Sequence, residues 1–262
     1  MSCPRFDFHM HPKHAGCANA TMELPAIVQQ SHSVGVVAIG ITDHLNRPEQ
    51  IPLHRQIRDE LLTMQSPVDV FFGVELNFTG CDQGFVFSEE IKQEYQFQFA
   101  IGGIHSTYLN EFDLDKIIEI QHRHHLKTCE DSLVDVLVHP YWFSRKEFKD
   151  KNWPFIESMK PVRESLTREL AQAAKETGTA IEINVGANIR RQKDYVEEYV
   201  DYLSIFAQEG TMFTIGSDAH SIDHLLDIKL AWDVVDRLGI PEERIWRPAT
   251  EPLLKACEVA KS

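Results

Sequence analysis

Short apolar runs alternate with longer amphipathic stretches over most of this 262-residue chain. Runs rich in Val, Ile and Phe are typical of strands buried on both faces of a parallel sheet, and we expect seven, at 5–10, 36–42, 68–75, 97–104, 134–139, 179–184 and 211–216. Helices are expected at 22–33, 50–64, 114–126, 162–177, 193–209 and 222–238. Roughly seven β–α units predict a barrel-like α/β fold, with an open doubly wound sheet as the alternative.

The charge balance is acidic, since 26 Lys and Arg against 40 Asp and Glu give a net charge of −14. Without a block of Lys or Arg, the chain is a poor candidate for binding long nucleic acid, but a small phosphorylated metabolite is not excluded. The five cysteines are odd in number and scattered, which is typical of a reduced intracellular protein. No apolar run reaches the roughly 20 residues of a membrane span. We therefore expect a cytoplasmic protein, and its oligomeric state is left open.

Residues that can bind metal stand at the end of every expected strand but one. They are His9, His11, Asp43, His44, Glu75, His105, His139, Asp218 and His220. The carboxyl ends of strands in a parallel barrel lie at one rim, so residues distant in sequence converge there. A lone His at such a position is usually a packed residue, and a lone Asp or Glu usually caps the next helix. The joint pattern predicts a multinuclear metal site, and its nitrogen and oxygen ligands suit Zn, Fe or Mn better than Ca or Mg.

The first of these segments places two imidazoles on one side of a strand. His9 and His11 are two residues apart, so both can reach one ion. Asp7 lies on the same face and is expected to orient a ligand imidazole through its other ring nitrogen. Three further histidines are expected on a solvated helix face, namely His122, His124 and His125.

Together, these motifs resemble those of the polymerase-and-histidinol-phosphatase (PHP) family of metal-dependent phosphoesterases. In family order they are Asp7-Phe8-His9-Met10-His11, Asp43-His44, Glu75, His105, His139-Pro140 and Asp218-Ala219-His220. The resemblance implies a distorted, TIM-like (β/α)7 barrel, formed here by a single domain over residues 1–262, and two or three divalent metal ions. The segment 181–191, IEINVGANIRR, is similar to the histidinol-phosphatase branch, in which an Arg after a Glu-Ile-Asn strand grips phosphate.

The resemblance also implies which residues hold each ion. One ion would be held by His9, His11, Glu75 and Asp218. A second would be held by Glu75, His105 and His139. His44 and His220 would contribute to a third, whose remaining ligand is usually a His where this chain has Cys17. A thiolate binds Zn, so Cys17 is one candidate and His14 is the other; if neither binds, the third site is weak or empty.

The resemblance implies hydrolysis of a small phosphomonoester, similar to histidinol phosphate, by attack of a metal-activated hydroxide on phosphorus. Arg190 or Arg191 is expected to bind phosphate, with a solvated basic pair as the alternative. Asn184 is a candidate hydrogen-bond donor to substrate. Arg145 is a weaker candidate, in the long connection 141–160 that we expect to be an active-site loop.

The proton donor to the leaving oxygen is left open between Asp43, His220 and a metal-bound water. Three other functions remain as alternatives. A PHP-type nuclease could act on nucleotides or nucleic-acid ends. A non-catalytic metal-binding module could regulate a partner, although the presence of the full ligand set argues against it. A metal-dependent amide hydrolase is disfavoured, because no Lys stands at an expected strand end to act as the modified bridging Lys of such enzymes.

Overall fold

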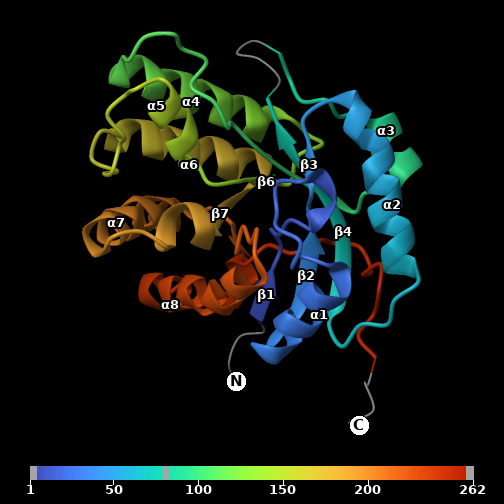
Figure 1. Cartoon of the computed structure of the whole chain (residues 1–262). Helices are drawn as coiled ribbons and strands as arrows, with labels where there is room; N and C mark the ends of the chain where they lie inside the picture. The colour runs from blue at the N-terminus through green and yellow to red at the C-terminus, as the bar shows by residue number, and fades with distance from the viewer. Residues whose placement is uncertain (1–4, 79–82, 258–262) are drawn as a thin grey trace.

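The computed structural model, which describes residues 5–78 and 83–257, has at its centre a nearly closed barrel of seven parallel strands (Figure 1). In order around the sheet these strands are β1 (Arg5–Asp7), β2 (Val36–Ile41), β4 (Asp69–Asn77), β5 (Phe99–Gly103), β6 (Val136–Leu137), β7 (Ala180–Asn184) and β8 (Phe213–Gly216). The two-residue strand β3 (His44–Leu45) pairs with β4. Each of the seven expected strands is present, several of them shorter than the apolar run that predicted it.

Hydrogen bonds close the barrel between its first and last strands. The N–H of Phe8, just after β1, donates to the carbonyl of Ile215 in β8 at 2.9 Å. Farther along, the N–H of Asp218 donates to the carbonyl of His9 at 2.8 Å, and Met10 forms a parallel bridge with Ala219. The barrel is therefore confirmed, and the open doubly wound sheet is wrong for this chain.

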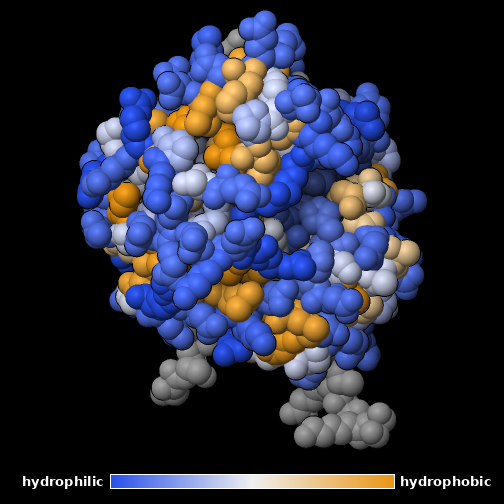
Figure 2. Space-filling model, turned by 60° about the vertical axis from the view of Figure 1, so that its left-hand side comes forward, coloured by the Kyte–Doolittle hydropathy of each residue, from blue (hydrophilic) through white to orange (hydrophobic). Residues whose placement is uncertain are grey.

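Eight α-helices in the described ranges surround the barrel. They are α1 (Leu24–Ser33), α2 (Ile51–Leu62), α3 (Glu89–Tyr95), α4 (Leu114–Glu130), α5 (Arg145–Asp150), α6 (Glu164–Thr177), α7 (Lys193–Glu209) and α8 (Ile228–Leu238). In Figure 1, α4 to α8 lie on one side and α1 to α3 on the other. The face in Figure 2 is largely hydrophilic and is hollowed at one place. Within the described ranges, no helix has the length and apolar character needed to cross a bilayer.

The helices α3 and α5 were not expected. Both are short, and α5 lies inside the long connection 141–160. Each begins at a serine whose side chain accepts the N–H of the third residue after it: Ser88 caps α3 and Ser144 caps α5. The final expected helix starts as a 3-10 turn, η4 (Ile222–Asp227), before α8. Three more such turns are η1 (Lys13–Ala15), η2 (Pro48–Gln50) and η5 (Glu242–Arg244).

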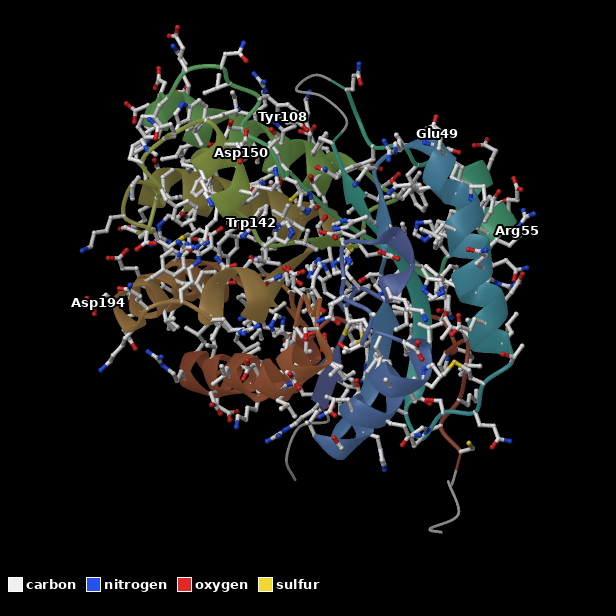
Figure 3. All side chains as sticks on the ribbon, in the orientation of Figure 1. Glu49, Arg55, Tyr108, Trp142, Asp150 and Asp194 are labelled. Carbon is white, nitrogen blue, oxygen red and sulfur yellow. The ribbon has the colours of Figure 1, made fainter. Side chains whose placement is uncertain are left out.

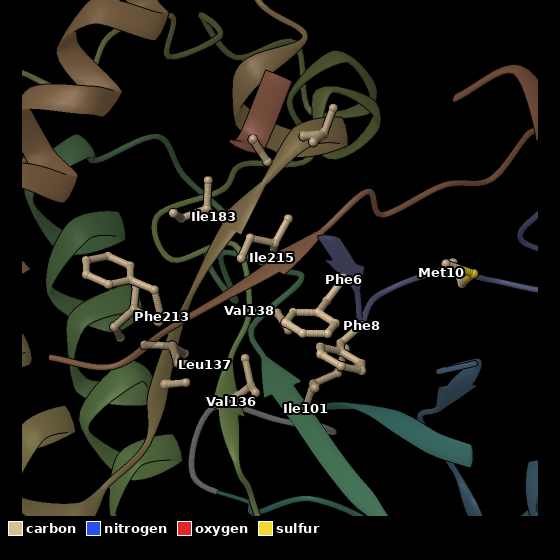
Figure 4. Close-up of a cluster of buried hydrophobic side chains, with 14 of the residues drawn as sticks. Phe6, Phe8, Met10, Ile101, Val136, Leu137, Val138, Ile183, Phe213 and Ile215 are labelled. Carbon is tan, nitrogen blue, oxygen red and sulfur yellow. The ribbon is translucent and has the colours of Figure 1, made fainter. Parts of the chain in front are cut away.

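Aromatic rings fill the barrel interior. Phe99 stands between Gly40 and Gly73, where an added Cβ would come within 2.6 and 2.5 Å of its ring. Phe8 and Trp246 pack on Phe99 with ring centroids 6.2 and 5.7 Å away. Figure 4 shows neighbouring core residues that lie in the strands or directly after them, among them Phe8, Ile101, Val138, Ile183 and Ile215. Burial of such side chains stabilises the fold by about 1.5–3 kcal/mol each and gives the polar rim a rigid base.

The histidines of α4 are buried, so the expected solvated face is wrong. The ring of His122 lies 2.9 Å from the hydroxyl of Tyr141 and 3.1 Å from the carboxylate of Glu169 on α6. Nε2 of His125 accepts the N–H of Tyr141 at 3.0 Å. The connection after β6 and helix α6 therefore supply hydrogen-bond partners for His122 and His125, a tertiary arrangement that no local pattern reveals.

Candidate metal centre

The metal-capable side chains converge at the carboxyl-terminal rim of the barrel. Their ligand atoms form three overlapping groups, and within a group all these atoms lie within 4.8 Å of one another. The groups are His9, His11 and Asp218; His44, Glu75 and His105; and His11, Cys17, His44 and His220. His139 lies beside the second group, with its Nε2 3.1 Å from Oε1 of Glu75. All the residues expected to bind metal are thus in one cluster.

Glu75, near the end of β4, is fully buried at the centre of this cluster. Its Oε1 lies 3.0 Å from Nε2 of His105 and 3.1 Å from Nε2 of His139. Its Oε2 lies 3.5 Å from Nε2 of His9 and 3.4 Å from Nε2 of His11. Burial opposes ionisation, but the surrounding imidazoles hold the pKa of Glu75 well below its usual range. Nδ1 of His44 lies nearer still to Oε2, at 2.7 Å. The two carboxylate oxygens thus face different groups of imidazoles, which suits a carboxylate shared by two cations.

His9 is oriented by Glu182, whose role the sequence did not lead us to expect. The two side chains meet at 2.7 Å between Nδ1 of His9 and Oε1 of Glu182. When Nδ1 carries the proton for this bond, Nε2 keeps a lone pair that faces Nε2 of His11 at 3.0 Å. Oε2 of Glu182 accepts the N–H of His139 at 2.8 Å and the amide of Asn184 at 2.9 Å. The sequence signal for this role was a carboxylate placed between Ile181 and Ile183 in strand β7.

Asp7 does not take the role expected for it. Its Oδ1 accepts the backbone N–H groups of His9 at 3.3 Å and Ser217 at 2.9 Å, rather than a ring nitrogen. Burial raises the pKa of Asp7 to about 6. Asp7 therefore joins the segments that follow β1 and β8, and Glu182 orients the imidazole.

The structure separates the two candidates for the third group. Nε2 of His14 pairs with Glu60 at 3.0 Å. Sγ of Cys17 instead belongs to the group that contains His11, His44 and His220. Burial opposes thiolate formation, but hydrogen bonds with these three imidazoles lower the pKa of Cys17 to about 5. The geometry therefore favours Cys17 over His14.

The two candidate proton donors differ in surroundings. Asp43 is buried and accepts the N–H of Ala15 at 2.9 Å and the thiol of Cys17 at 3.7 Å. Burial would raise its pKa, but the His11 imidazole, whose Nδ1 lies 3.8 Å away, and backbone N–H groups outweigh this effect and lower the pKa, so Asp43 is better suited to hold the Cys17 segment than to donate a proton. His220 is 35% exposed, and its Nδ1 donates to a backbone carbonyl at 3.0 Å, which leaves Nε2 accessible.

Two residues of the cluster have a left-handed backbone, with φ of 28° at His139 and 52° at Asp218. Such conformations cost about 1–3 kcal/mol each in residues other than Gly, and they occur at functional sites where the surrounding structure enforces them. Gly216 lies just before this turn. A Cβ at Gly216 would collide with Oε1 of Glu182 and lie 2.6 Å from Cβ of His9. The close approach of β8 to these two side chains therefore requires glycine.

The sequence matches the model of the PHP domain family over residues 7–218. The chain belongs to the PHP domain family. Histidinol phosphate phosphatase from Lactococcus lactis, solved with zinc, L-histidinol and phosphate, is 18% identical with a TM-score of 0.59, over 98% of this chain and 100% of that one. A putative histidinol phosphatase from Listeria monocytogenes is 12% identical with a TM-score of 0.61, over 84% and 97%. No curated protein matches the sequence. At these identities the two structures show a shared fold.

A pocket of about 140 Å³ opens at the cluster of this PHP domain; its lining residues are His44, Glu75, His105, His139, Trp142, Asp218 and His220. Arg145, Arg190 and Arg191 line a neighbouring pocket of about 330 Å³, and Trp142 belongs to both. Asn184 lines neither, because its amide donates to Glu182 and Asp218 at 2.9 and 3.3 Å while its Oδ1 accepts the N–H of Ala187 at 2.6 Å. Asn184 thus supports the cluster, contrary to the expectation that it contacts substrate.

The donor set of this PHP domain fits divalent cations. Several buried atoms of the cluster have no hydrogen bond of good geometry in the described ranges, among them Nδ1 of His11, Nδ1 of His44 and Oε2 of Glu75, although the last two lie 2.7 Å apart. An unpaired buried polar group costs about 1–3 kcal/mol, so this concentration of unpaired atoms indicates that the cluster is built for a ligand. Imidazoles, carboxylates and a thiol form a set that suits zinc and the transition metals beside it.

Proposed function

We propose that this PHP domain is a metal-dependent phosphoesterase that hydrolyses a small phosphomonoester of the cytoplasm. The observation that carries the proposal is the position of Glu75, whose two oxygens face different groups of imidazoles. Adjacent cations that share a carboxylate are typical of enzymes that displace an ester oxygen from phosphorus. Membership of the PHP domain family supports the same reaction class.

We assign the ligands to two sites that share Glu75 and to a third site beside them. His9, His11, Glu75 and Asp218 are proposed to hold one cation. Glu75, His105 and His139 are proposed to hold the second. The third is assigned to Cys17, His44 and His220, because their ligand atoms form one group in the structure.

Bound cations of this kind lower the pKa of water towards neutrality and neutralise charge on phosphoryl oxygens. The chain's own residues set the conditions for this chemistry. Glu182 holds the proton on Nδ1 of His9, so Nε2 remains a ligand. Arg190 and Arg191, in the pocket beside the metal centre, are proposed to bind a phosphate of the substrate through their guanidinium groups. His220 lines the pocket at the metal centre and is proposed to donate the proton to the leaving oxygen when the third site is empty, because its Nδ1 bonds a backbone carbonyl and its Nε2 cannot both bind a cation and carry a proton.

The test combines metal analysis with a substrate panel. Purified protein loaded with Zn, Mn or Fe is offered histidinol phosphate, an aryl phosphate and a short oligonucleotide. We expect phosphate release from monoesters, loss of release on chelation and recovery on adding metal back. Asp218→Ala should lose bound metal and activity together, whereas Asp223→Ala, an exposed carboxylate nearby, should keep both. Phosphate release from verified metal-free protein would refute the proposal.

The same panel decides between the alternatives. Preferential cleavage of the oligonucleotide would show a nuclease, although the net charge of −14 disfavours long nucleic acid as a partner. A fully loaded protein that releases phosphate from no ester would favour a metal-binding regulatory module.

A further inference from the structure

A second pocket, of about 330 Å³, lies beside the metal centre. Its lining residues are Trp142, Ser144, Arg145, Lys146, Gly186, Ala187, Arg190 and Arg191. Four of these eight are cationic and none is a carboxylate, although the chain as a whole has a net charge of −14. We call it the cation pocket.

The cation pocket adjoins the metal centre directly. The Trp142 ring lines both pockets and lies 5.4 Å from the ring of His139, between centroids. Gly186 lies against Asp218 so closely that an added Cβ would be 3.1 Å from its carbonyl oxygen and 3.3 Å from its Cβ. Figure 3 shows Trp142 towards the centre of the molecule, while Asp194 at the start of α7 lies at the periphery. A single small molecule can therefore reach from one pocket into the other.

Two separate elements supply the cations. On one side, β7 runs into a single π-helical turn, η3 (Val185–Ile189), which delivers Arg190 and Arg191. Turns of this kind are rare in proteins, and those that occur are often found at functional sites. On the other side, Arg145 and Lys146 begin α5. The guanidinium groups of Arg145 and Arg191 lie 4.3 and 5.2 Å from the centre of the Phe155 ring, which holds both in place.

Existing ion pairs do not cancel this charge. Arg145 pairs with Glu157 at 2.9 Å, and Lys146 pairs with Asp150 at 2.6 Å. Arg190 pairs with Asp227 at 3.2 Å. All three pairs are at least one-third exposed to solvent, and pairs of this kind contribute little, so a bound anion can replace or join them.

Arg191 is different from the other three cations. Its Nε donates to the carbonyl of Ala187 at 2.7 Å, and its guanidinium lies 4.5 Å from the centre of the Tyr195 ring. Within the described ranges it has no carboxylate at ion-pair distance, although it is only partly exposed. A guanidinium without an ion pair is available to bind an anion from a ligand, although Glu157 and Asp194 line another pocket with Arg191.

We infer that the leaving group of the substrate carries a second phosphate, which binds in the cation pocket while the phosphate to be cleaved lies at the metal centre. This inference rests on the proposed phosphoesterase function and narrows its substrate class to small bisphosphorylated alcohols. Water adds to one phosphorus, the ester oxygen departs with a proton as an alcohol, and the second phosphate stays on that product. Histidinol phosphate does not meet this requirement, because its amino group is cationic at neutral pH and four cations would repel it.

Binding of inert analogues tests the inference without turnover. The probes are alkane bisphosphonates of increasing chain length, the matching alkylphosphonates and the matching aminoalkylphosphonates, titrated into metal-loaded protein by calorimetry. We expect the best bisphosphonate to bind about tenfold or more tightly than its monophosphonate, which corresponds to one added charge-assisted hydrogen bond. The aminoalkylphosphonate should bind more weakly than the alkylphosphonate.

Variants locate the effect. Arg145→Glu and Lys146→Glu, both exposed at the start of α5, should remove the preference for the bisphosphonate. Lys149→Glu makes the same charge change on the same helix outside the pocket and should keep the preference. Equal affinity for all three probes, or tightest binding of the aminoalkylphosphonate, would overturn the inference.

Three hydrolysable esters separate this inference from the proposed function: the alkanediol bisphosphate, the alkyl phosphate and the aminoalkyl phosphate that correspond to the three probes. Hydrolysis of all three esters with equal kcat/KM would overturn the inference and leave the phosphoesterase standing. A bisphosphonate preference in protein that hydrolyses none of them would overturn the phosphoesterase, while the cation pocket would remain a phosphate site.

Discussion

Replacement of Glu182 by glutamine tests how the metal centre is organised, because the change conserves shape and removes one acceptor. The carboxylate faces three donors: Nδ1 of His9 at Oε1, and the N–H of His139 and the amide of Asn184 at Oε2. Glutamine offers one oxygen and one NH2 group. If the NH2 group faces His9, that ring must move its proton to Nε2 and lose the lone pair towards the cluster. If it faces the other two donors, both are left unpaired.

The magnitude follows from these contacts. Each unpaired buried donor costs about 1–3 kcal/mol. Loss of the carboxylate that orients a metal-binding His lowers metal affinity by about 10–100-fold, or about 1.4–2.8 kcal/mol. We therefore expect Glu182→Gln to bind its tightest metal about 10–100-fold more weakly.

Competition with a chromophoric chelator measures this affinity. Glu169→Gln is a matched control, since Glu169 makes a similar contact with the buried His122 outside the metal centre, at 3.1 Å. It should leave metal affinity unchanged. If Glu182→Gln folds and binds metal with wild-type affinity and stoichiometry, Glu182 does not fix the His9 tautomer and the reasoning fails.

Three further results are expected. Gly216→Ala forces a Cβ against Glu182 and His9, so we expect the free energy of unfolding to fall by about 1–3 kcal/mol in thermal denaturation, and metal binding to weaken. Gly84→Ala is the control, because a Cβ there meets nothing within 4 Å, and it should change neither quantity. Normal metal binding in Gly216→Ala would contradict the close approach. Cys17→Ser should lower the metal count of the loaded protein by one ion per chain, and Cys257→Ser should not; an unaltered count would remove Cys17 from the third group. Burial and nearby imidazoles hold the pKa of His125 well below its usual range, so the native state keeps this ring neutral. The unfolded chain takes up a proton on this ring below about pH 6.5. The stability that the neutral ring contributes is therefore present above about pH 6.5 and decreases below that value by up to about 1.4 kcal/mol per pH unit. Denaturant unfolding of metal-free protein from pH 7.5 to 5 should show a smaller decrease for His125→Gln than for wild type, and equal slopes would show that His125 is protonated in the native state.

The ligands could be anticipated because the barrel places all carboxyl strand ends together, whatever their separation in sequence. His9 and Asp218 are 209 residues apart in number, yet the N–H of Asp218 bonds the carbonyl of His9 because β1 and β8 are neighbours. Order along the chain was therefore enough to place these side chains at one rim. The order of residues along the chain did not show that β1 ends at Asp7, nor that His9 and His11 lie in the extended segment after this strand.

The supporting residues were harder to find, because their roles depend on side-chain direction across strands. Asp7 and Glu182 are both buried carboxylates on strands, and the one closer in sequence to the histidines was expected to orient a ring. In the structure Asp7 turns to backbone N–H groups and Glu182 reaches across from β7. The choice between Cys17 and His14 likewise depended on Glu60 of α2, which pairs with His14.

Asn184 links the metal centre to the cation pocket through one side chain. Its amide nitrogen donates to Glu182 and Asp218, so it holds two carboxylates that would otherwise repel each other. Its oxygen accepts the N–H of Ala187, in the turn that leads to Arg190 and Arg191. The three bonds use the amide nitrogen and the oxygen of one buried residue, so a single side chain ties the π-helical turn to both carboxylates. The fold therefore fixes the cationic side chains relative to the candidate metal ligands, as the proposed recognition of two phosphates at a set spacing requires.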